Sequence, residues 1–286
     1  MSAYSFRSAA PDTADPHRSP ARWSRFRFPE TPIRLTAILG ILLFVLYSFE
    51  FLGIDLDRLL GAFPRVIQLI ATRYWPVDLE YVSQPDFLAS VLQTLQMSLL
   101  GGFFGVVVAI PLAWFASRNV TPIRWLLFPF GRASIIGCRA IHETIWTVLF
   151  VMILGFGTLS GILALMMFCI GFAGKLFSDE IEAIEMGAVE ALRSAGANPL
   201  QVFQYAVMPQ IRVAIVGISI YTWDVAFRAA TVVGFFGGGG MGLYLKRSVQ
   251  QLETHRVAAI LLSIIALVTV AELLSGWLRN KVRRMK

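Results

Sequence analysis

Apolar residues along the chain gather in long runs instead of recurring at a helical or strand period. Five runs cover about residues 33–53, 87–116, 162–177, 211–236 and 257–278. A run of roughly 20 apolar residues is long enough to cross the hydrocarbon core of a bilayer as a helix. Each run therefore predicts a membrane-spanning helix.

A further crossing is predicted between the second and third of these runs. It begins somewhere after Pro129 and ends near Leu154, and its bounds stay open at this point. The sequence GFGTLSG at 155–161 predicts a tight glycine turn after it. Pro111 is expected to kink the span over 87–116. The predicted fold class is thus all-α, a polytopic membrane protein with about six transmembrane helices.

The polar stretches predict what lies between the spans. Residues 1–32 are rich in Arg, Ser and Pro and predict a disordered basic tail, and 281–286 form a second basic tail. The segment 33–84 would hold the first span and an external amphipathic helix over about 56–74. Residues 85–280 would form the core of the protein, with a polar insert at 178–209. The glycine-led segment 237–256 is expected to be a flexible outer loop.

Composition and charge agree with a membrane protein. The chain is 56% hydrophobic and 15% charged, against about 25% charged residues in soluble domains. The net charge of +7 comes from basic residues in the chain ends and short loops, where the positive-inside rule explains them. That rule places both termini and the insert in the cytoplasm and 237–256 outside. The expected partner is membrane lipid, and no basic stripe with exposed aromatics indicates nucleic acid.

The insert predicts two short helices joined by a bend. Ser178, Asp179 and Glu180 are suited to start a helix. Gly196 can end it in the left-handed conformation, and Asn198 with Pro199 can cap and begin a second helix. Three apolar residues, Leu200, Phe203 and Val207, are expected to share one face of it, and Pro209 opens the next span. The residues alone leave open an ordinary loop or a helix that fills a groove on a partner.

The insert resembles the Glu-Ala-Ala loop of permease subunits in bacterial ABC importers. That motif is Glu-Ala-Ala, three residues, Gly, nine residues, then Ile-x-Leu-Pro. Its spacing is kept in full, with Glu190, Ala191, Gly196 and Pro209 matching and with apolar substitutions at Leu192, Ala206 and Met208. RAIHETIWTVLFV, GFG, GKLFSDEIEAIE and FRAATVVGFFGGGGMG resemble one branch, the phosphonate importer permeases, and the likeness covers roughly 85–280.

The resemblance implies a fold, partners and a mechanism. The fold would be that of an ABC type I importer permease in the bacterial inner membrane. The partners would be a second permease copy, two cytoplasmic ATPase subunits that hold ATP and Mg, and an external substrate-binding protein. The chain would bind no cofactor or metal and would not be an enzyme. The coupling loop would comprise Glu190, Ala191, Leu192, Gly196, Asn198, Pro199, Leu200, Phe203 and Pro209. The substrate stays open between phosphonate, phosphite, phosphate ester and another oxyanion.

Charged residues inside the spans form a second set of candidates. Arg139 and Glu143 lie four apart, as do Asp224 and Arg228, so each pair is expected to share one side of a helix. Charges in lipid need a partner or a polar cavity. They are either internal ion pairs or cations that lower the barrier for an anion in the pathway.

Other functions find less support in the sequence. His142-Glu143 lacks the second His of a zinc motif, and no Gly-Lys-Ser/Thr follows the glycines at 237–240. Cys138 and Cys169 have no metal or disulfide spacing. No nucleophile and base indicate a membrane enzyme. A stand-alone secondary transporter is the less favoured alternative, because no internal repeat is visible and the insert would lack a purpose.

Overall fold

The computed structural model describes residues 30–53 and 56–283, and every regular element in these ranges is a helix. Contacts divide the chain into two units, Met1–Ile67 and Gln68–Lys286. In the first unit, α1 (Glu30–Phe51) is apolar on all sides and its described side chains are almost all exposed. This confirms a first helix long enough to span. Most of the tails predicted at 1–32 and 281–286 lies outside the described residues, but α1 already begins at Glu30 and α12 runs to Arg283, so both tails are shorter than predicted.

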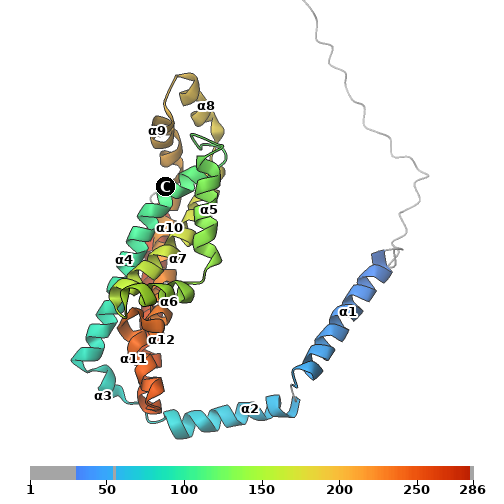
Figure 1. Cartoon of the computed structure of the whole chain (residues 1–286), viewed down its shortest axis with the longest axis vertical. Coiled ribbons are helices and arrows are strands. Elements are labelled where there is room, and N and C mark those ends of the chain that lie inside the picture. The colour runs from blue at the N-terminus through green and yellow to red at the C-terminus, as the bar shows by residue number, and fades with distance from the viewer. Residues whose placement is uncertain (1–29, 54–55, 284–286) are drawn as a thin grey trace, which may run out of the picture. The chain divides into compact units, whose positions relative to one another are not determined.

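The second unit is a bundle of long helices (Figure 1). Its long members are α4 (Pro85–Ala116), α7 (Thr158–Glu182), α10 (Met208–Val233) and α12 (Thr254–Arg283). Its shorter members are α3 (Leu79–Val82), α5 (Leu127–Ala140), α6 (Glu143–Leu154), α8 (Met186–Ser194), α9 (Pro199–Val202) and α11 (Gly240–Gln250). The described residues hold five helices long and apolar enough to cross a membrane, or six if the bent pair α5 and α6 is one span.

The predicted amphipathic helix is present but ends in a wider turn. It comprises α2 (Leu56–Leu69), which continues into the π-helical segment η1 (Ile70–Tyr74). A short loop leads from it to α3, where Asp78 Oδ1 accepts a hydrogen bond of 3.1 Å from the Tyr81 amide. This cap fixes the start of α3.

Small residues at every fourth position explain the close packing of α4 on α7. Gly101, Gly105, Ala109 and Ala113 are all buried on α4. Residues four apart lie on one face of a helix, and small side chains let two backbones approach in lipid. Pro111 lies inside α4, which runs on to Ala116. The span predicted at 87–116 is confirmed.

The third crossing is broken, and its prediction as one helix was wrong. The axes of α5 and α6 differ by 90° at the break after Ala140. No proline or glycine marks this break. Instead Ile141 is extended, and the His142 side chain caps α6 by accepting from the Thr144 amide. The end at Leu154 and the glycine turn are confirmed, although α7 already begins at Thr158.

The start of the insert also differs from the prediction, because α7 runs through Ser178, Asp179 and Glu180 to Glu182. Nothing in this stretch breaks a helix. The Ser178 side chain is buried, with its hydroxyl 3.5 Å from the Ala116 carbonyl, and Asp179 pairs with Lys175 one turn earlier. These polar side chains therefore take part in packing and ion pairing inside α7, and they do not begin a new helix.

The glycine segment at 237–256 is ordered, so its prediction as a flexible loop was wrong. The π-helical segment η3 (Gly234–Gly238) leads into α11, and residues 237–242 are all buried. The Met241 amide donates a 2.9 Å hydrogen bond to Thr94 Oγ1 of α4. The absence of side chains here serves close packing of backbone on backbone.

Candidate functional site

The bend of the insert lies at one end of the bundle, where α8 and α9 project past α4 and α5 (Figure 1). Gly196 has φ +82° and ends α8 as predicted. Its amide donates to the Arg193 carbonyl over 3.0 Å, and the Ala197 amide donates to the Leu192 carbonyl over 3.0 Å. These two bonds form a Schellman motif, which satisfies carbonyls at the helix end and fixes the direction of the next residues.

The start of α9 is fixed by a capping box, as Asn198 and Pro199 predict. The Gln201 amide donates to Asn198 Oδ1 over 2.8 Å, and the Asn198 amide donates to Gln201 Oε1 over 2.9 Å. Pro199 stands in the first turn, where its missing N–H costs nothing. The bend is thus held by backbone geometry on both sides.

The second helix of the insert is continuous with the fifth span, which the sequence did not indicate. Helix α9 continues into the π-helical segment η2 (Phe203–Val207) and then into α10 without a break. Pro209 lies in the first turn of α10, as predicted. Helix α9, η2 and α10 therefore form one continuous helical path from the bend into the fifth span.

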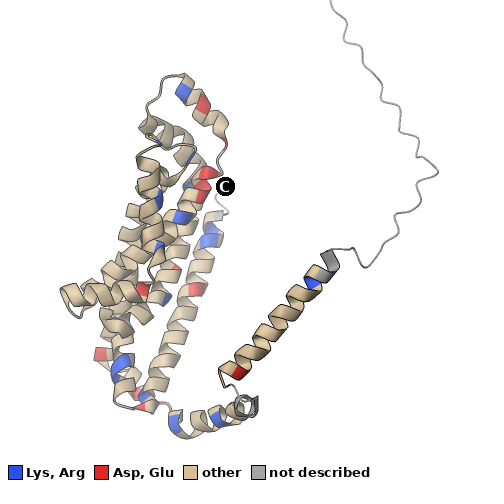
Figure 2. Cartoon of the chain, turned by 45° about the vertical axis from the view of Figure 1, so that its right-hand side comes forward, with Lys and Arg blue, Asp and Glu red and all other residues tan. Residues whose placement is uncertain are grey.

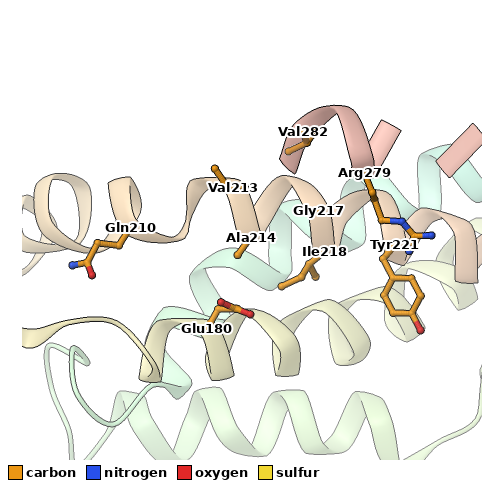
Figure 3. A pocket seen from close by; sticks show the side chains of 9 residues that line it. All are labelled: Glu180, Gln210, Val213, Ala214, Gly217, Ile218, Tyr221, Arg279 and Val282. Carbon is orange, nitrogen blue, oxygen red and sulfur yellow. The ribbon is translucent and has the colours of Figure 1, made fainter. Parts of the chain in front are cut away.

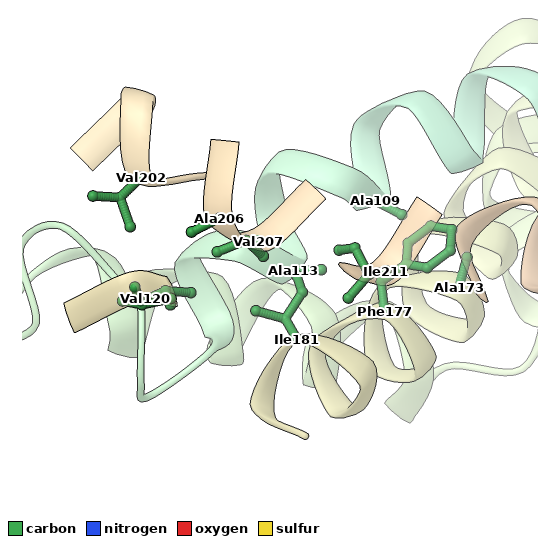
Figure 4. Packing of buried hydrophobic residues seen from close by; sticks show 11 residues of the cluster. Ala109, Ala113, Val120, Ala173, Phe177, Ile181, Val202, Ala206, Val207 and Ile211 are labelled. Carbon is green, nitrogen blue, oxygen red and sulfur yellow. The ribbon is translucent and has the colours of Figure 1, made fainter. Parts of the chain in front are cut away.

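An apolar cluster fastens this end of the insert to the bundle (Figure 4). Val202, Ala206 and Val207 are buried against α4 and α7 residues that include Phe177 and Ile181. Their spacing along the helix places them on one face. From α8, Val189 is fully buried in the same cluster.

The prediction that Leu200, Phe203 and Val207 share one buried face was wrong for Leu200. Leu200 is 60% exposed, whereas Val207 is buried. Phe203 stacks on the Trp114 ring of α4 with 4.6 Å between centroids. The buried face passes through Val202, two residues and about half a helical turn away from Leu200, so Leu200 stays on the surface.

Polar contacts that the sequence did not reveal anchor the bend to the ends of α4 and α7. Arg193 Nη2 donates to the Asn119 carbonyl over 3.1 Å. The side-chain nitrogen Nδ2 of Asn119 donates to the Ile181 carbonyl over 2.8 Å. Glu182 accepts a 2.6 Å ion-pair bond from Arg132 of α5. Arg193 thereby ties α8 to the loop that follows α4, and the other two bonds tie that loop to α7 and α7 to α5.

A second anchor joins the start of α8 to the start of α10. The Glu185 amide donates to Gln210 Oε1 over 3.0 Å, and Gln210 Nε2 donates to the Ala206 carbonyl over 2.8 Å. Gln210 is a long polar side chain in the first turn of an apolar span. That contrast is the sequence signal that points to it.

The outer side of the bend is open. Glu190, Ala191, Ser194 and Leu200 are exposed, and Leu192 is partly buried. Within residues 30–53 and 56–283, the Glu190 carboxylate has no ion-pair partner. The bend therefore offers a fixed surface with one free carboxylate and one exposed leucine.

One of the two predicted charge pairs is formed inside the bundle. Arg228 Nη2 lies 3.0 Å from Asp224 Oδ2 on α10. The Asp224 side chain is 3% exposed and that of Arg228 is 45% exposed. The other oxygen, Asp224 Oδ1, is buried and accepts no hydrogen bond from the described residues. Figure 2, in which charged residues colour the ribbon, shows that most of the bundle is built from uncharged residues.

The other predicted pair, Arg139 with Glu143, is not formed. The break between α5 and α6 separates the two residues, and the Glu143 carboxylate lies 3.4 Å from His142 Nε2 instead. Both residues nevertheless line one cavity of about 140 Å³, together with His142, Phe168 and Phe172. Among the described residues, no group of three or more His, Cys, Asp or Glu side chains is placed to hold a metal ion.

The fold is that of a type I ABC importer permease. The MetNI methionine ABC transporter in an inward-facing conformation superposes with a TM-score of 0.57 at 21% identity, covering 68% of this chain and 95% of that one. An amino acid ABC transporter solved with histidines superposes with a TM-score of 0.58 at 20% identity, covering 71% and 94%. At these identities the likeness defines the fold alone.

The family model described as "Binding-protein-dependent transport system inner membrane component" matches residues 87–284. The chain belongs to this family, as the resemblance of its insert implies. It is a multi-pass inner-membrane permease component of a binding-protein-dependent transporter, and it is not the ATPase of that transporter.

Curated relatives are similar over much of the chain. The phosphite transport system permease PtxC of Stutzerimonas stutzeri is 36% identical, covering 82% of this chain and 85% of that protein. The phosphate-import permease PhnE of Mycolicibacterium smegmatis is 37% identical over 74% of this chain, which spans only 40% of that relative. The putative cryptic phosphonate permease PhnE2 of Escherichia coli K12 is 37% identical over 41% of this chain and 97% of its own length.

Proposed function

We propose that this chain forms the membrane pathway of an ABC importer for a phosphorus oxyanion, with a phosphonate as the first candidate and phosphite as the alternative. The observation that carries the proposal is the anchored bend between α8 and α9, which is exposed on its outer side and continuous with α10. The names of the relatives, which cite phosphite, phosphate and phosphonate, support this class of substrate.

The bend is the coupling loop of this proposal. A groove on the cytoplasmic ATPase takes up the outer side of α8, where the Glu190 carboxylate and the surface around Gly196 lie open. When the ATPase closes on ATP and Mg, it displaces α8 and α9. The capping box and the buried cluster keep the bend from yielding, so α10 moves with α9.

The orientation follows from charge. Arg279 near the end of α12 lines one cavity with Gln210 and Glu180, so the basic end of α12 lies at the same end of the bundle as the bend. Basic residues flanking spans favour the cytoplasmic side. This supports a cytoplasmic bend and a cytoplasmic C-terminus. The assembly is a permease homodimer with two ATPase subunits and an external binding protein.

Growth on single phosphorus sources tests the substrate. A strain that lacks this gene is expected to grow on phosphate and to lose growth on an alkylphosphonate, with recovery when the wild-type gene returns. Loss of growth on phosphite alone would show that the substrate is phosphite and would leave the proposed mechanism unchanged. Uptake of the labelled oxyanion is measured in parallel after deletion of the ATPase subunit, and uptake that persists would contradict an ATP-driven importer.

Arg228→Gln is expected to lower the transport rate at least about ten-fold, because a charged hydrogen bond contributes about 1.5–3 kcal/mol. The change also leaves Asp224 buried without its cation, which is destabilising in itself. The double variant Asp224→Asn with Arg228→Gln removes both charges and serves as the control. Loss of uptake in an assembled double variant supports a pathway role. Normal uptake in the double variant would show that the pair is structural only.

A further inference from the structure

A cavity of about 620 Å³ lies between α7, α10 and α12 at the same end of the bundle as the bend (Figure 3). Glu180 enters it from α7 and Arg279 from α12, while α10 supplies Gln210, Ile218 and Tyr221. The bend does not include this cavity, and the coupling mechanism does not require it.

Two opposite charges line the cavity without neutralising each other. The Arg279 guanidinium lies 5.4 Å from the centroid of the Tyr221 ring. In the described part of the chain, neither Arg279 nor Glu180 takes part in an ion pair. An unpaired charge at the edge of a lipid bilayer costs free energy unless a ligand or water compensates it.

The place of Glu180 in its helix is also unfavourable, although its side chain is exposed. It stands in the last turn of α7 with two other acids, and this turn holds no basic residue. A helix carries partial negative charge at its C-terminus, so acids there are unfavourable. Asp179 is paired with Lys175 and Glu182 with Arg132. Glu180 alone of the three is left to face the cavity.

The remaining lining is largely apolar. Val213, Ala214 and Ile218 of α10 and Val282 of α12 face the same space. A ligand that complements this cavity carries an anionic group to pair with Arg279, a cationic group to pair with Glu180, and an apolar chain to contact the apolar residues. Basic pockets between membrane helices on the cytoplasmic side bind phospholipid headgroups.

We propose that the cavity binds an aminophospholipid of the inner leaflet, with its phosphate at Arg279 and its ammonium group at Glu180. An acyl chain would lie along the apolar wall of α10. The site rests on the proposed function only in placing this end at the cytoplasmic face. Gln210 lines the cavity and also holds the Glu185 amide, so bound lipid braces the anchor between α8 and α10. A soluble aminoalkylphosphonate shares the headgroup chemistry but lacks the chain.

Native mass spectrometry of the full chain in detergent tests this site with phosphatidylethanolamine and phosphatidylglycerol as probes. Arg279→Gln is expected to weaken retention of both lipids about five-fold, the effect of one cation at a membrane surface. Glu180→Gln is expected to abolish the preference for phosphatidylethanolamine. Lys281→Gln is the matched control, because Lys281 is exposed and lies over the Trp277 ring at 5.2 Å, outside the cavity.

Each outcome decides the proposal independently of transport. Equal retention of both lipids by the wild type and all three variants overturns it. Displacement of bound lipid by aminoethylphosphonate, with the same dependence on Arg279, would assign the site to a soluble ligand and overturn the lipid proposal. If Arg279→Gln does not fold, Glu180→Gln still decides, since an unchanged lipid preference in that variant contradicts the proposed headgroup contact.

Discussion

Gly196→Glu is expected to abolish transport while the chain still folds and inserts into the membrane. Gly196 has φ +82°, and a Cβ atom added there meets no heavy atom within 4 Å. The left-handed conformation costs a residue with a side chain roughly 1–2 kcal/mol, which is too little to unfold a bundle. The added carboxylate, however, stands on the exposed surface that we propose as the ATPase contact, which also carries the free carboxylate of Glu190.

The expected loss is set by the contact between the subunits. A hot-spot residue near the centre of a protein interface contributes about 2 kcal/mol or more, and a loss of this size corresponds to roughly 30-fold weaker binding of the ATPase. The measurements are uptake of the labelled oxyanion and co-purification of the ATPase with the tagged permease. Glu190→Lys reverses the free charge of the same surface and is expected to weaken co-purification without altering membrane insertion.

Gly196→Asn is the matched control for this prediction. Asn accepts the left-handed conformation better than other residues with a side chain, and it adds no charge. Transport in Gly196→Asn is therefore expected to stay near the wild-type level. Normal transport and normal ATPase binding in Gly196→Glu would show that the bend is not the coupling loop.

The bend could be predicted from the sequence because its geometry depends on local chemistry. Gly196 permits a positive φ, and Asn198 followed by Pro199 caps and begins a helix, whatever surrounds them. The structure confirms both features. The Asp224 and Arg228 pair could be predicted for the same reason, since residues four apart on one helix are neighbours.

The features that the sequence did not reveal depend on contacts between distant segments. Arg193 contacts the Asn119 carbonyl, 74 residues away, and no local pattern indicates that bond. The break after Ala140 separates Arg139 from Glu143 without a proline or glycine, so helical spacing gave a wrong pairing. Ser178 has the character of a cap, yet the Ala116 carbonyl lies 3.5 Å from its hydroxyl inside a continuous helix.

The glycine segment was misjudged for a related reason. Glycines predict flexibility when no partner is known, but they also permit two backbones to touch. Here the second effect dominates, because α11 turns back onto the end of α10 and contacts α4 through Thr94. The glycine segment follows the end of α10 and packs against α4. It therefore helps to fix the end of α10 that is far from the bend.

Gly242→Ala is accordingly expected to destabilise the folded chain severely. A Cβ atom at this position would lie 2.1 Å from the Thr231 carbonyl oxygen and 2.4 Å from the Phe235 amide nitrogen. Both are backbone atoms of α10 and η3, so no side chain can rotate away to make room. Overpacking of a core costs about 3 kcal/mol when the backbone must shift. The thermal midpoint in detergent is expected to fall by on the order of 10 °C.

Gly276→Ala distinguishes this contact from the general effect of a glycine in a helix. Gly276 lies inside α12, and a Cβ atom added there meets no heavy atom within 4 Å. Alanine in an open helix position is more stable than glycine by about 0.5–1 kcal/mol, so this variant is expected to melt at or above the wild-type temperature. The same atom is added in both variants, and only its surroundings differ. Opposite shifts of the two midpoints show that backbone contact holds α11 against α10, whereas a Gly242→Ala protein as stable as the wild type would contradict the close packing of this segment.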